Sequence, residues 1–310
     1  MKASTFIIVF IFLLVSCNRD FTFHEKKILN DYPSGSGAAY FKDHIYLIGD
    51  DATDLLVLNT RLKKVDSLKL FSNFEKRISK ESKPDLEAAT IIYKKNNTQL
   101  LLLGSGSLTP HRNIGLLIDL DTKEKKQIDL NPFYSRLKND GLDALNIEGV
   151  TAVPAGFIIA SRGNKSFPAN YIIFTSNNFF INQDSVAIKK IKVGTNPDTA
   201  AFAGISGLEY SRISDKLLIT VSTENTYNTV DDGTIGKSYL WVIDNISAKK
   251  NMIAINPSRI IDLDELDERF TGHKIESVCI LSENKKQMEL ALVADDDKGA
   301  TILFKITLKK

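Results

Sequence analysis

Cysteine is scarce in this sequence: among its 310 residues there are only two, Cys17 and Cys279. Cys17 lies in the N-terminal leader and Cys279 in a short apolar run, so no disulfide framework can form within the mature chain. We therefore predict that Cys279 is a small buried hydrophobic residue. The alternative, a nucleophilic cysteine, would need His273 as its base.

Neither sign of charge dominates, since 40 Lys and Arg face 38 Asp and Glu, for a formal net charge of +2. Lysine is spread along the chain without a dense basic cluster, so nothing here indicates a nucleic-acid partner. The four histidines lack the spacing of a metal site. The single tryptophan, Trp241, falls in an expected strand and is predicted to pack rather than to stack on a base.

The one long apolar run spans residues 6–15, after a basic start at Lys2. Ten residues are too few to span a bilayer but suit the core of a signal peptide. Residues 14–17, Leu-Val-Ser-Cys, resemble a bacterial lipobox, in which the cysteine becomes the lipidated N-terminus after cleavage. We expect residues 1–17 to be a lipoprotein signal peptide and Cys17 to carry the lipid. An ordinary cleaved signal that contains a cysteine is the alternative.

Asn18 gives no inner-membrane retention signal, so the expected location is the bacterial cell envelope, as an outer-membrane lipoprotein.

A short motif recurs along residues 18–310, which we expect to form one domain. In each copy a polar residue precedes a small residue and then an apolar strand. Such self-similarity is typical of repeat architectures. The copies are residues 34–38, 85–89, 146–150, 204–208 and 274–278, with reference positions Ser36, Glu87, Glu148, Ser206 and Glu276.

Each copy is followed by the same series of short strands, of which the second is strongly apolar, as in residues 100–103 and 217–221. About four short strands per copy, separated by turn signals, predict an all-β propeller. The last copy ends after its third strand, and a strand at residues 25–29 precedes the first copy. The economical arrangement is five blades, with the N-terminal strand completing the last blade and closing the ring. Six blades are the alternative, because residues 251–267 could hold further strands.

The five reference residues are expected to converge, because the first strand of each blade lines the channel of a propeller. Three carboxylates close together repel one another and need a cation or bound protons. Oxygen ligands without histidine or cysteine suit Ca²⁺. We therefore predict a central Ca²⁺ held by Ser36, Glu87, Glu148, Ser206 and Glu276. Alternatively, each glutamate bonds to backbone amides and seals the channel.

The turns after the second strands are expected to surround the end of the channel where the reference residues lie, because first and second strands run antiparallel. They lie at residues 49–51, 104–107, 161–164, 222–225 and 295–297. Their acidic, Gly and Ser residues with one arginine fit a phosphate or carboxylate ligand. In this interpretation Arg162 is a bidentate clamp and Asp50, Asp51 or Glu224 orients a water. The alternative is that these residue types are simply turn formers.

Two further segments lie between the repeats. The loose basic run of Arg77, Lys80 and Lys83 is interrupted by Glu81, and we interpret it as a solvated linker between the first two blades. A long insert at residues 226–238 could cover the mouth as a lid. Its Asp-Asp-Gly sequence at 231–233 is typical of a turn.

The order Ser, Glu, Glu, Ser, Glu at the reference positions resembles the calcium-dependent apyrase family. The first repeat, from Ser36 to the acidic pair Asp50 and Asp51, is similar to the opening blade of that family. The resemblance implies a five-bladed propeller whose central Ca²⁺ is held by the five reference residues, with Asp50 or Asp51 near the attacking water. It spans the ring from about Ser36 to the C-terminus and rests on five short motifs, without the long aromatic and basic loops of that family. The blade-start pattern is also similar to phytase-like propellers of bacterial envelopes.

Two functions fit these patterns. The first is a Ca²⁺-dependent phosphoric-ester hydrolase acting on a nucleotide or a phytate-like substrate, with Arg162 holding the phosphate and Asp50, Asp51 or Glu224 orienting water. The second is a non-enzymatic propeller with a structural ion that binds a small phosphorylated ligand or a protein partner at the same mouth. Both place the chain on a membrane through the lipid at Cys17, and neither involves nucleic acid.

Overall fold

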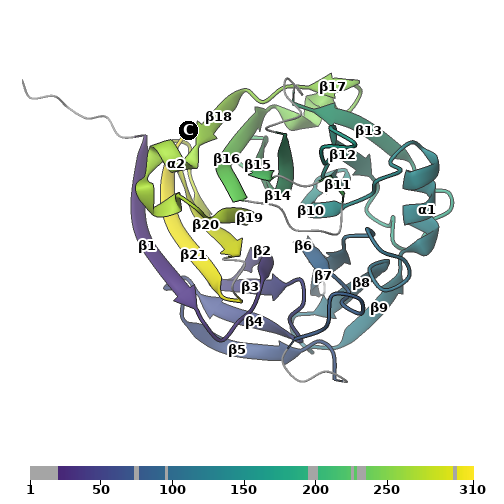
Figure 1. The fold of residues 1–310 in the computed structure, drawn as a ribbon, viewed down its shortest axis with the longest axis horizontal. Coiled ribbons are helices and arrows are strands. Elements are labelled where there is room, and N and C mark those ends of the chain that lie inside the picture. The colour runs from purple at the N-terminus through teal and green to yellow at the C-terminus, as the bar shows by residue number, and fades with distance from the viewer. Residues whose placement is uncertain are drawn as a thin grey trace, which may run out of the picture.

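The computed structural model describes residues 20–72, 77–94, 97–194, 202–224, 227–228, 235–295 and 299–310. Its strands form five small sheets arranged around a central axis (Figure 1). The prediction of an all-β propeller with five blades is therefore confirmed.

The first four blades follow one another along the chain, and each begins at the axis and proceeds outward. Blade one consists of β2 (Gly35–Phe41), β3 (His44–Gly49), β4 (Asp54–Asn59) and β5 (Lys64–Lys69). Blade two consists of β6 (Leu86–Tyr93), β7 (Thr98–Gly104), β8 (Ile114–Asp119) and β9 (Lys125–Asp129). Blade three consists of β10 (Ile147–Val153), β11 (Gly156–Ser161), β12 (Asn170–Thr175) and β13 (Ile188–Val193). Blade four consists of β14 (Ala203–Ser211), β15 (Lys216–Glu224), β16 (Ile235–Asp244) and β18 (Arg259–Asp262).

Blade five joins the two ends of the described chain. Its strands from the axis outward are β19 (Lys274–Glu283), β20 (Gln287–Asp295), β21 (Thr301–Lys309) and β1 (Phe21–Leu29). β1 pairs antiparallel with β21 from Phe21 opposite Leu308 to Leu29 opposite Thr301. The N-terminal strand thus closes the ring as predicted, and it begins four residues earlier than expected because Phe21 is buried against Phe270.

Residues 251–267 do not form a sixth blade. β17 (Ala254–Ile255) adds a short parallel strand to the edge of blade three, and β18 is the outer strand of blade four. The acidic stretch that follows forms α2 (Leu263–Leu266) and the 3₁₀ helix η3 (Glu268–Phe270). Another 3₁₀ helix, η2 (Ile246–Lys249), precedes β17.

One helix was not predicted from the sequence. α1 (Asn131–Asn139) has proline at its start, where the missing N–H costs nothing. Phe133, Tyr134 and Leu137 are buried and pack with residues of blades two and three. The helix therefore fills the space between two blades, a tertiary role that its nine residues do not reveal by periodicity alone.

The hydrophobic core is divided into five clusters, one between each pair of neighbouring blades. At the junction that closes the ring, Ile45 and Leu47 of blade one pack with Val293 and Leu303 of blade five. Each such buried side chain contributes about 1.5–3 kcal/mol. Cys279 lies in the same cluster, where burial raises the pKa of its thiol, so its predicted role as a buried hydrophobic residue is confirmed.

Within the described part of the chain, no helix has the length and apolar character needed to cross a membrane.

Candidate functional site at one mouth of the channel

The five reference positions of the repeat all lie at irregularities in strand pairing. In each blade the register between the first and second strands skips one residue of the first strand. The skipped residues are Ser36, Glu87, Glu148, Ser206 and Glu276. A β-bulge re-aims the side chain of the skipped residue, and bulges are frequent beside functional sites. Each first strand therefore includes its reference residue, which the sequence analysis placed before the strand. In every blade the bulge lies near the same end of the first strand. We call this end of the channel the mouth.

The two serines of this set bond to the neighbouring blade. Ser36 Oγ donates a hydrogen bond to the carbonyl oxygen of Leu86, 2.6 Å away. Ser206 Oγ donates to the carbonyl oxygen of Ile275, 2.5 Å away. Each acceptor immediately precedes the bulged glutamate of the next blade. These hydroxyls therefore tie blade one to blade two and blade four to blade five.

Two of the three glutamates are buried and have partners within the protein. Glu148 Oε1 accepts a hydrogen bond of 2.6 Å from Asn146 Nδ2. Glu276 Oε1 lies 3.0 Å from Lys274 Nζ. The third, Glu87, is half-buried. All three belong to first strands, in blades two, three and five, so they face the axis from three of its five sides.

Burial raises the pKa of all three glutamates, and repulsion between them adds to the effect. The charge of Asp85, followed by that of Glu148, raises the pKa of Glu87 further. Burial raises the pKa of Glu148 to about 8, against the opposing effect of Arg162. These carboxyls therefore share one electrostatic environment.

We expect the stability of the propeller to decrease as pH rises from about 5 to 8. Glu148 keeps its proton in the folded chain up to a pKa of about 8, against an ordinary value of 4.5. The folded state therefore holds one more proton than the unfolded state between these values, and the stabilisation it gives is lost as pH rises through the folded pKa. The Glu148→Gln variant stays neutral and should show a smaller difference in melting temperature between pH 5.5 and 8.5. Identical pH profiles of variant and wild type would contradict this assignment.

Two buried cations neutralise the glutamates of blades three to five. Arg162 Nη2 lies 2.9 Å from Glu224 Oε2. Lys274 Nζ lies 3.2 Å from the same oxygen and 3.0 Å from Glu276 Oε1. Gly204 makes room for this arrangement, since a Cβ there would lie 2.6 Å from Arg162 Nε. Arg162 is only 6% exposed, so a phosphate would have to compete with Glu224 for its guanidinium. Its role as a clamp stays a prediction.

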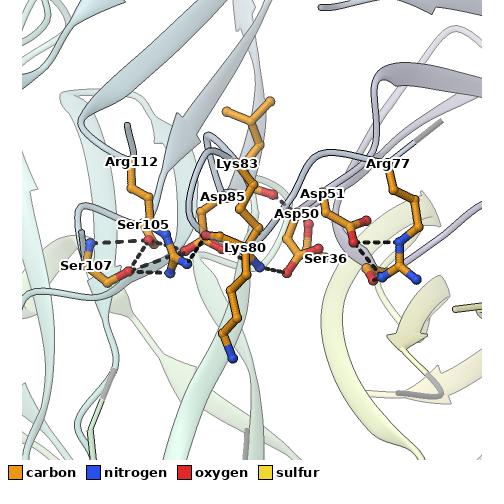
Figure 2. Close-up of polar contacts among 12 residues, drawn as sticks. Ser36, Asp50, Asp51, Arg77, Lys80, Lys83, Asp85, Ser105, Ser107 and Arg112 are labelled. Atoms are coloured by element: carbon orange, nitrogen blue, oxygen red, sulfur yellow. Dashed lines mark hydrogen bonds and ion pairs between the residues drawn. The ribbon is translucent and has the colours of Figure 1, made fainter. Parts of the chain in front are cut away.

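A second charged cluster lies between blades one and two (Figure 2). Lys83 Nζ contacts Asp50 Oδ2 and lies 2.7 Å from Asp85 Oδ1. Arg112 Nη1 lies 2.7 Å from Asp85 Oδ2, to which the hydroxyl of Ser105 also donates. Burial raises the pKa of Asp50, and Lys83 opposes that rise. Burial alone would lower the pKa of Lys83, but Asp50 and Asp85 outweigh it and raise the pKa. Lys83 is therefore a permanent cation between two carboxylates.

One group of carboxylates, among the residues that the structure describes, is compact enough for a metal ion. Oxygens of Asp50, Asp85 and Glu87 lie within 4.8 Å of one another. This group shares only Glu87 with the predicted ligand set. Lys83 Nζ already contacts Asp50 and Asp85, so an ammonium group takes the place that an ion would need. As placed, these residues do not fit a divalent cation, and the Ca²⁺ site stays a prediction from the sequence.

The basic linker between blades one and two belongs to this site. Its interpretation as a solvated segment holds at Arg77 and Lys80, which are exposed, but is wrong at Lys83. The side chain of Lys83 is only 12% exposed because it extends to Asp50 and Asp85. Arg77 Nε donates a hydrogen bond of 2.7 Å to Asp51 Oδ2. The sequence did contain a signal for Lys83, which stands four residues before a bulge. At four residues from the bulge, a side chain as long as that of lysine can reach the mouth.

The mouth contains a cavity of about 650 Å³. Three cations and three carboxylates are among its lining residues: Arg77, Lys80, Lys83, Asp50, Asp51 and Asp295. Oδ1 of Asp50 and Oδ1 of Asp51 are buried and accept no hydrogen bond from the described residues. The cavity is large enough for a small organic ligand and carries both donors and acceptors for it.

Other predicted features fall partly outside the described residues. Cys17, Asn225, Asp296 and Asp297 are among the residues not described, as are residues 229–234, which include the Asp-Asp-Gly sequence and about half of the proposed lid. Trp241 is buried beside Gly194, so its predicted packing role is confirmed.

The model of one protein family, described as a family of unknown function (DUF6929), matches residues 31–308. No curated protein matches the sequence. Among solved structures, the chain is similar to glutaminyl cyclase of Myxococcus xanthus, with 10% identity over 94% of this chain and 97% of that one, at a TM-score of 0.52. It also matches a DUF4623 family protein from Bacteroides eggerthii, with 10% identity over 93% of this chain and 76% of that one, at a TM-score of 0.40. The likeness to the cyclase shows the propeller fold alone.

Proposed function

We propose that this chain, which belongs to the family of unknown function DUF6929, is an exported, lipid-anchored propeller that binds a small phosphorylated ligand at the mouth of its channel. The observation that carries the proposal is the mouth cavity, where cations of the linker face carboxylate oxygens that lack donors. Export and the anchor rest on the leader and on Cys17.

The linker side of the cavity suits a phosphate group. Arg77 is 54% exposed at its side chain, and Lys80 is exposed on the same segment. Arginine binds phosphate through its planar fork and lysine through a point charge. Arg77 is already oriented by Asp51, which fixes its guanidinium at the cavity wall. A phosphate between these two side chains would bind without a metal.

The carboxylates that lie beside these cations suit hydroxyl groups. The unpartnered Oδ1 atoms of Asp50 and Asp51 are buried acceptors, and buried acceptors without donors are costly. Hydroxyls of a sugar or a ribose would supply the missing donors. The ligand class that fits both the cations and the carboxylates is therefore a sugar phosphate or a nucleotide.

The test is a titration of sugar phosphates and nucleotides, followed by calorimetry and melting temperature in buffer with EGTA. Lys80→Ala is expected to weaken binding of the best compound about tenfold, because it removes one charge-assisted hydrogen bond. Lys126→Ala, an exposed lysine on β9, is the matched control and should bind like wild type. If no phosphorylated compound binds, or if Lys80→Ala binds like wild type, this function is excluded.

Asp50 favours hydrolysis of a phosphoric ester as a second candidate. Burial raises its pKa at the cavity wall, as a general base requires. The resemblances to apyrases and to phytase-like propellers also favour phosphoric-ester hydrolysis. We place binding first because Lys83 already contacts the Asp50 carboxylate and opposes its protonation. Release of inorganic phosphate from a bound compound, abolished in Asp50→Asn, would establish hydrolysis.

A further inference from the structure

The N-terminal strand enters the ring at the end of the channel opposite the mouth. The backbone N–H of Lys309 donates to the carbonyl oxygen of Asp20 at 2.8 Å, next to the start of β1. The N–H of Lys310 donates to the carbonyl oxygen of Lys286 at 3.0 Å. Lys286 lies in the turn between β19 and β20, which is the end of the first strand remote from its bulge. β1 and β21 lie side by side along this outer edge (Figure 1).

Five turns join first and second strands at this end, and we call their surface the hairpin face. They are residues 42–43, 94–97, 154–155, 212–215 and 284–286. Their described residues include five basic side chains, Lys42, Lys94, Arg212, Lys285 and Lys286, against two acidic ones, Asp43 and Asp215. All five basic residues are exposed. The hairpin face is therefore positive, whereas the mouth is where the bulged glutamates gather.

Apolar and aromatic side chains accompany these cations. Ile213 is 59% exposed and Tyr93 is 53% exposed. The Arg212 guanidinium stacks 4.7 Å from the centre of the Tyr93 ring. Lys42 Nζ lies 5.0 Å from the centre of the Phe41 ring. Basic residues mixed with aromatic and aliphatic ones are typical of surfaces that lie at a lipid headgroup layer.

We infer that the hairpin face lies on a bilayer containing anionic lipids and that the mouth opens away from it. The inference rests on the proposed lipid at Cys17. Phe21 follows Cys17 by four residue steps, so a fully extended link spans at most about 14 Å. Even this maximum is less than twice the Debye length at physiological salt, about 8 Å, so the link keeps the ring near the anionic surface that attracts its basic residues. The lipid holds the ring at the bilayer, and the charge of the hairpin face orients it so that the ligand cavity faces solvent.

The test uses the full lipidated chain in phosphatidylcholine vesicles with and without phosphatidylglycerol, the lipids carrying a headgroup quencher. A fluorophore is placed at Ile213→Cys on the hairpin face or at Leu108→Cys in the turn after β7 at the mouth. Cys279 is buried and does not compete for the label. We expect several-fold stronger quenching at position 213 than at 108 in vesicles with phosphatidylglycerol. A variant combining Lys42→Gln, Lys94→Gln, Lys285→Gln and Lys286→Gln should lose this difference but still float with the vesicles.

Flotation and quenching separate two kinds of failure. A chain that floats with equal quenching at the two positions overturns the orientation and leaves the anchor intact. A chain that does not float, or that floats equally well as Cys17→Ser, overturns the lipid anchor and the orientation together. Neither result affects binding of a phosphorylated ligand to the chain in solution.

Discussion

Lys83→Met is expected to destabilise the propeller by about 3–5 kcal/mol, the cost of breaking a buried ion pair by removing one partner. Lys83 contacts Asp50 and lies 2.7 Å from Asp85, and the side chains of these two residues are 21% and 5% exposed. Asp85 keeps Arg112 as a partner, but Asp50 would lose its contact with Lys83 and keep only the weaker influence of Arg77. In a domain of this size the loss corresponds to a melting temperature lower by about 6–10 °C.

The matched control for this variant is Lys126→Met on β9, whose side chain is exposed and whose loss should change the melting temperature little. A second readout is the response to CaCl₂. With the ammonium group gone, the oxygens of Asp50, Asp85 and Glu87 form an acidic group that suits Ca²⁺, so Ca²⁺ should raise the melting temperature of Lys83→Met. An unchanged melting temperature of Lys83→Met, or equal stabilisation of variant and wild type by Ca²⁺, would contradict the role given to Lys83.

Arg162→Leu is expected to lower the free energy of unfolding by a similar amount, about 3–5 kcal/mol at pH 8. Arg162 is buried, lies 2.9 Å from Glu224 and acts on the charges of Glu148 and Glu276. Its removal leaves Lys274 as the nearby cation for three carboxyl groups. Urea unfolding should show a lower midpoint with an unchanged slope. Arg162→Lys should recover part of the loss, because lysine restores the charge but not the planar fork.

The pH dependence of this loss distinguishes charge from packing. Burial raises the pKa of Glu148 and of Glu276 and Arg162 opposes both rises, so without the guanidinium these two carboxyls bind protons more readily. Lower pH therefore removes part of the negative charge that Arg162 balances, and the difference in stability between Arg162→Leu and wild type should shrink as pH falls from 8 to 5. A loss of stability that is the same at both pH values would assign Arg162 a packing role instead.

The fold was accessible from the sequence because its signals recur five times. A polar residue near the start of each first strand repeats at positions such as Ser36 and Glu148, and the missing fourth strand of the last unit indicated closure by the N-terminal strand. α1 and β17 were not accessible in this way. Each occurs once, is short, and depends on the surface of blade three for its partners.

The residues at the bulges were found and Arg162 was expected at the mouth, but the ion pairs that Lys83, Arg162 and Lys274 form there were not predicted. Lys83 and Asp50 are 33 positions apart, and Arg162 and Glu224 are 62 apart. Local patterns do not encode how far a long side chain reaches across the axis of a ring. The sequence therefore suggested that converging carboxylates need an ion, whereas the structure shows that lysine and arginine side chains lie among them.

The central claim of this account is that the charge at the mouth is balanced by these side chains and not by a metal. Metal content and melting temperature of the soluble chain that starts after Cys17, measured with and without EGTA, test it most directly. We predict no stoichiometric metal and the same melting temperature in both buffers. About one Ca²⁺ per chain, together with a melting temperature several degrees lower in EGTA, would contradict the account and restore the central ion predicted from the sequence.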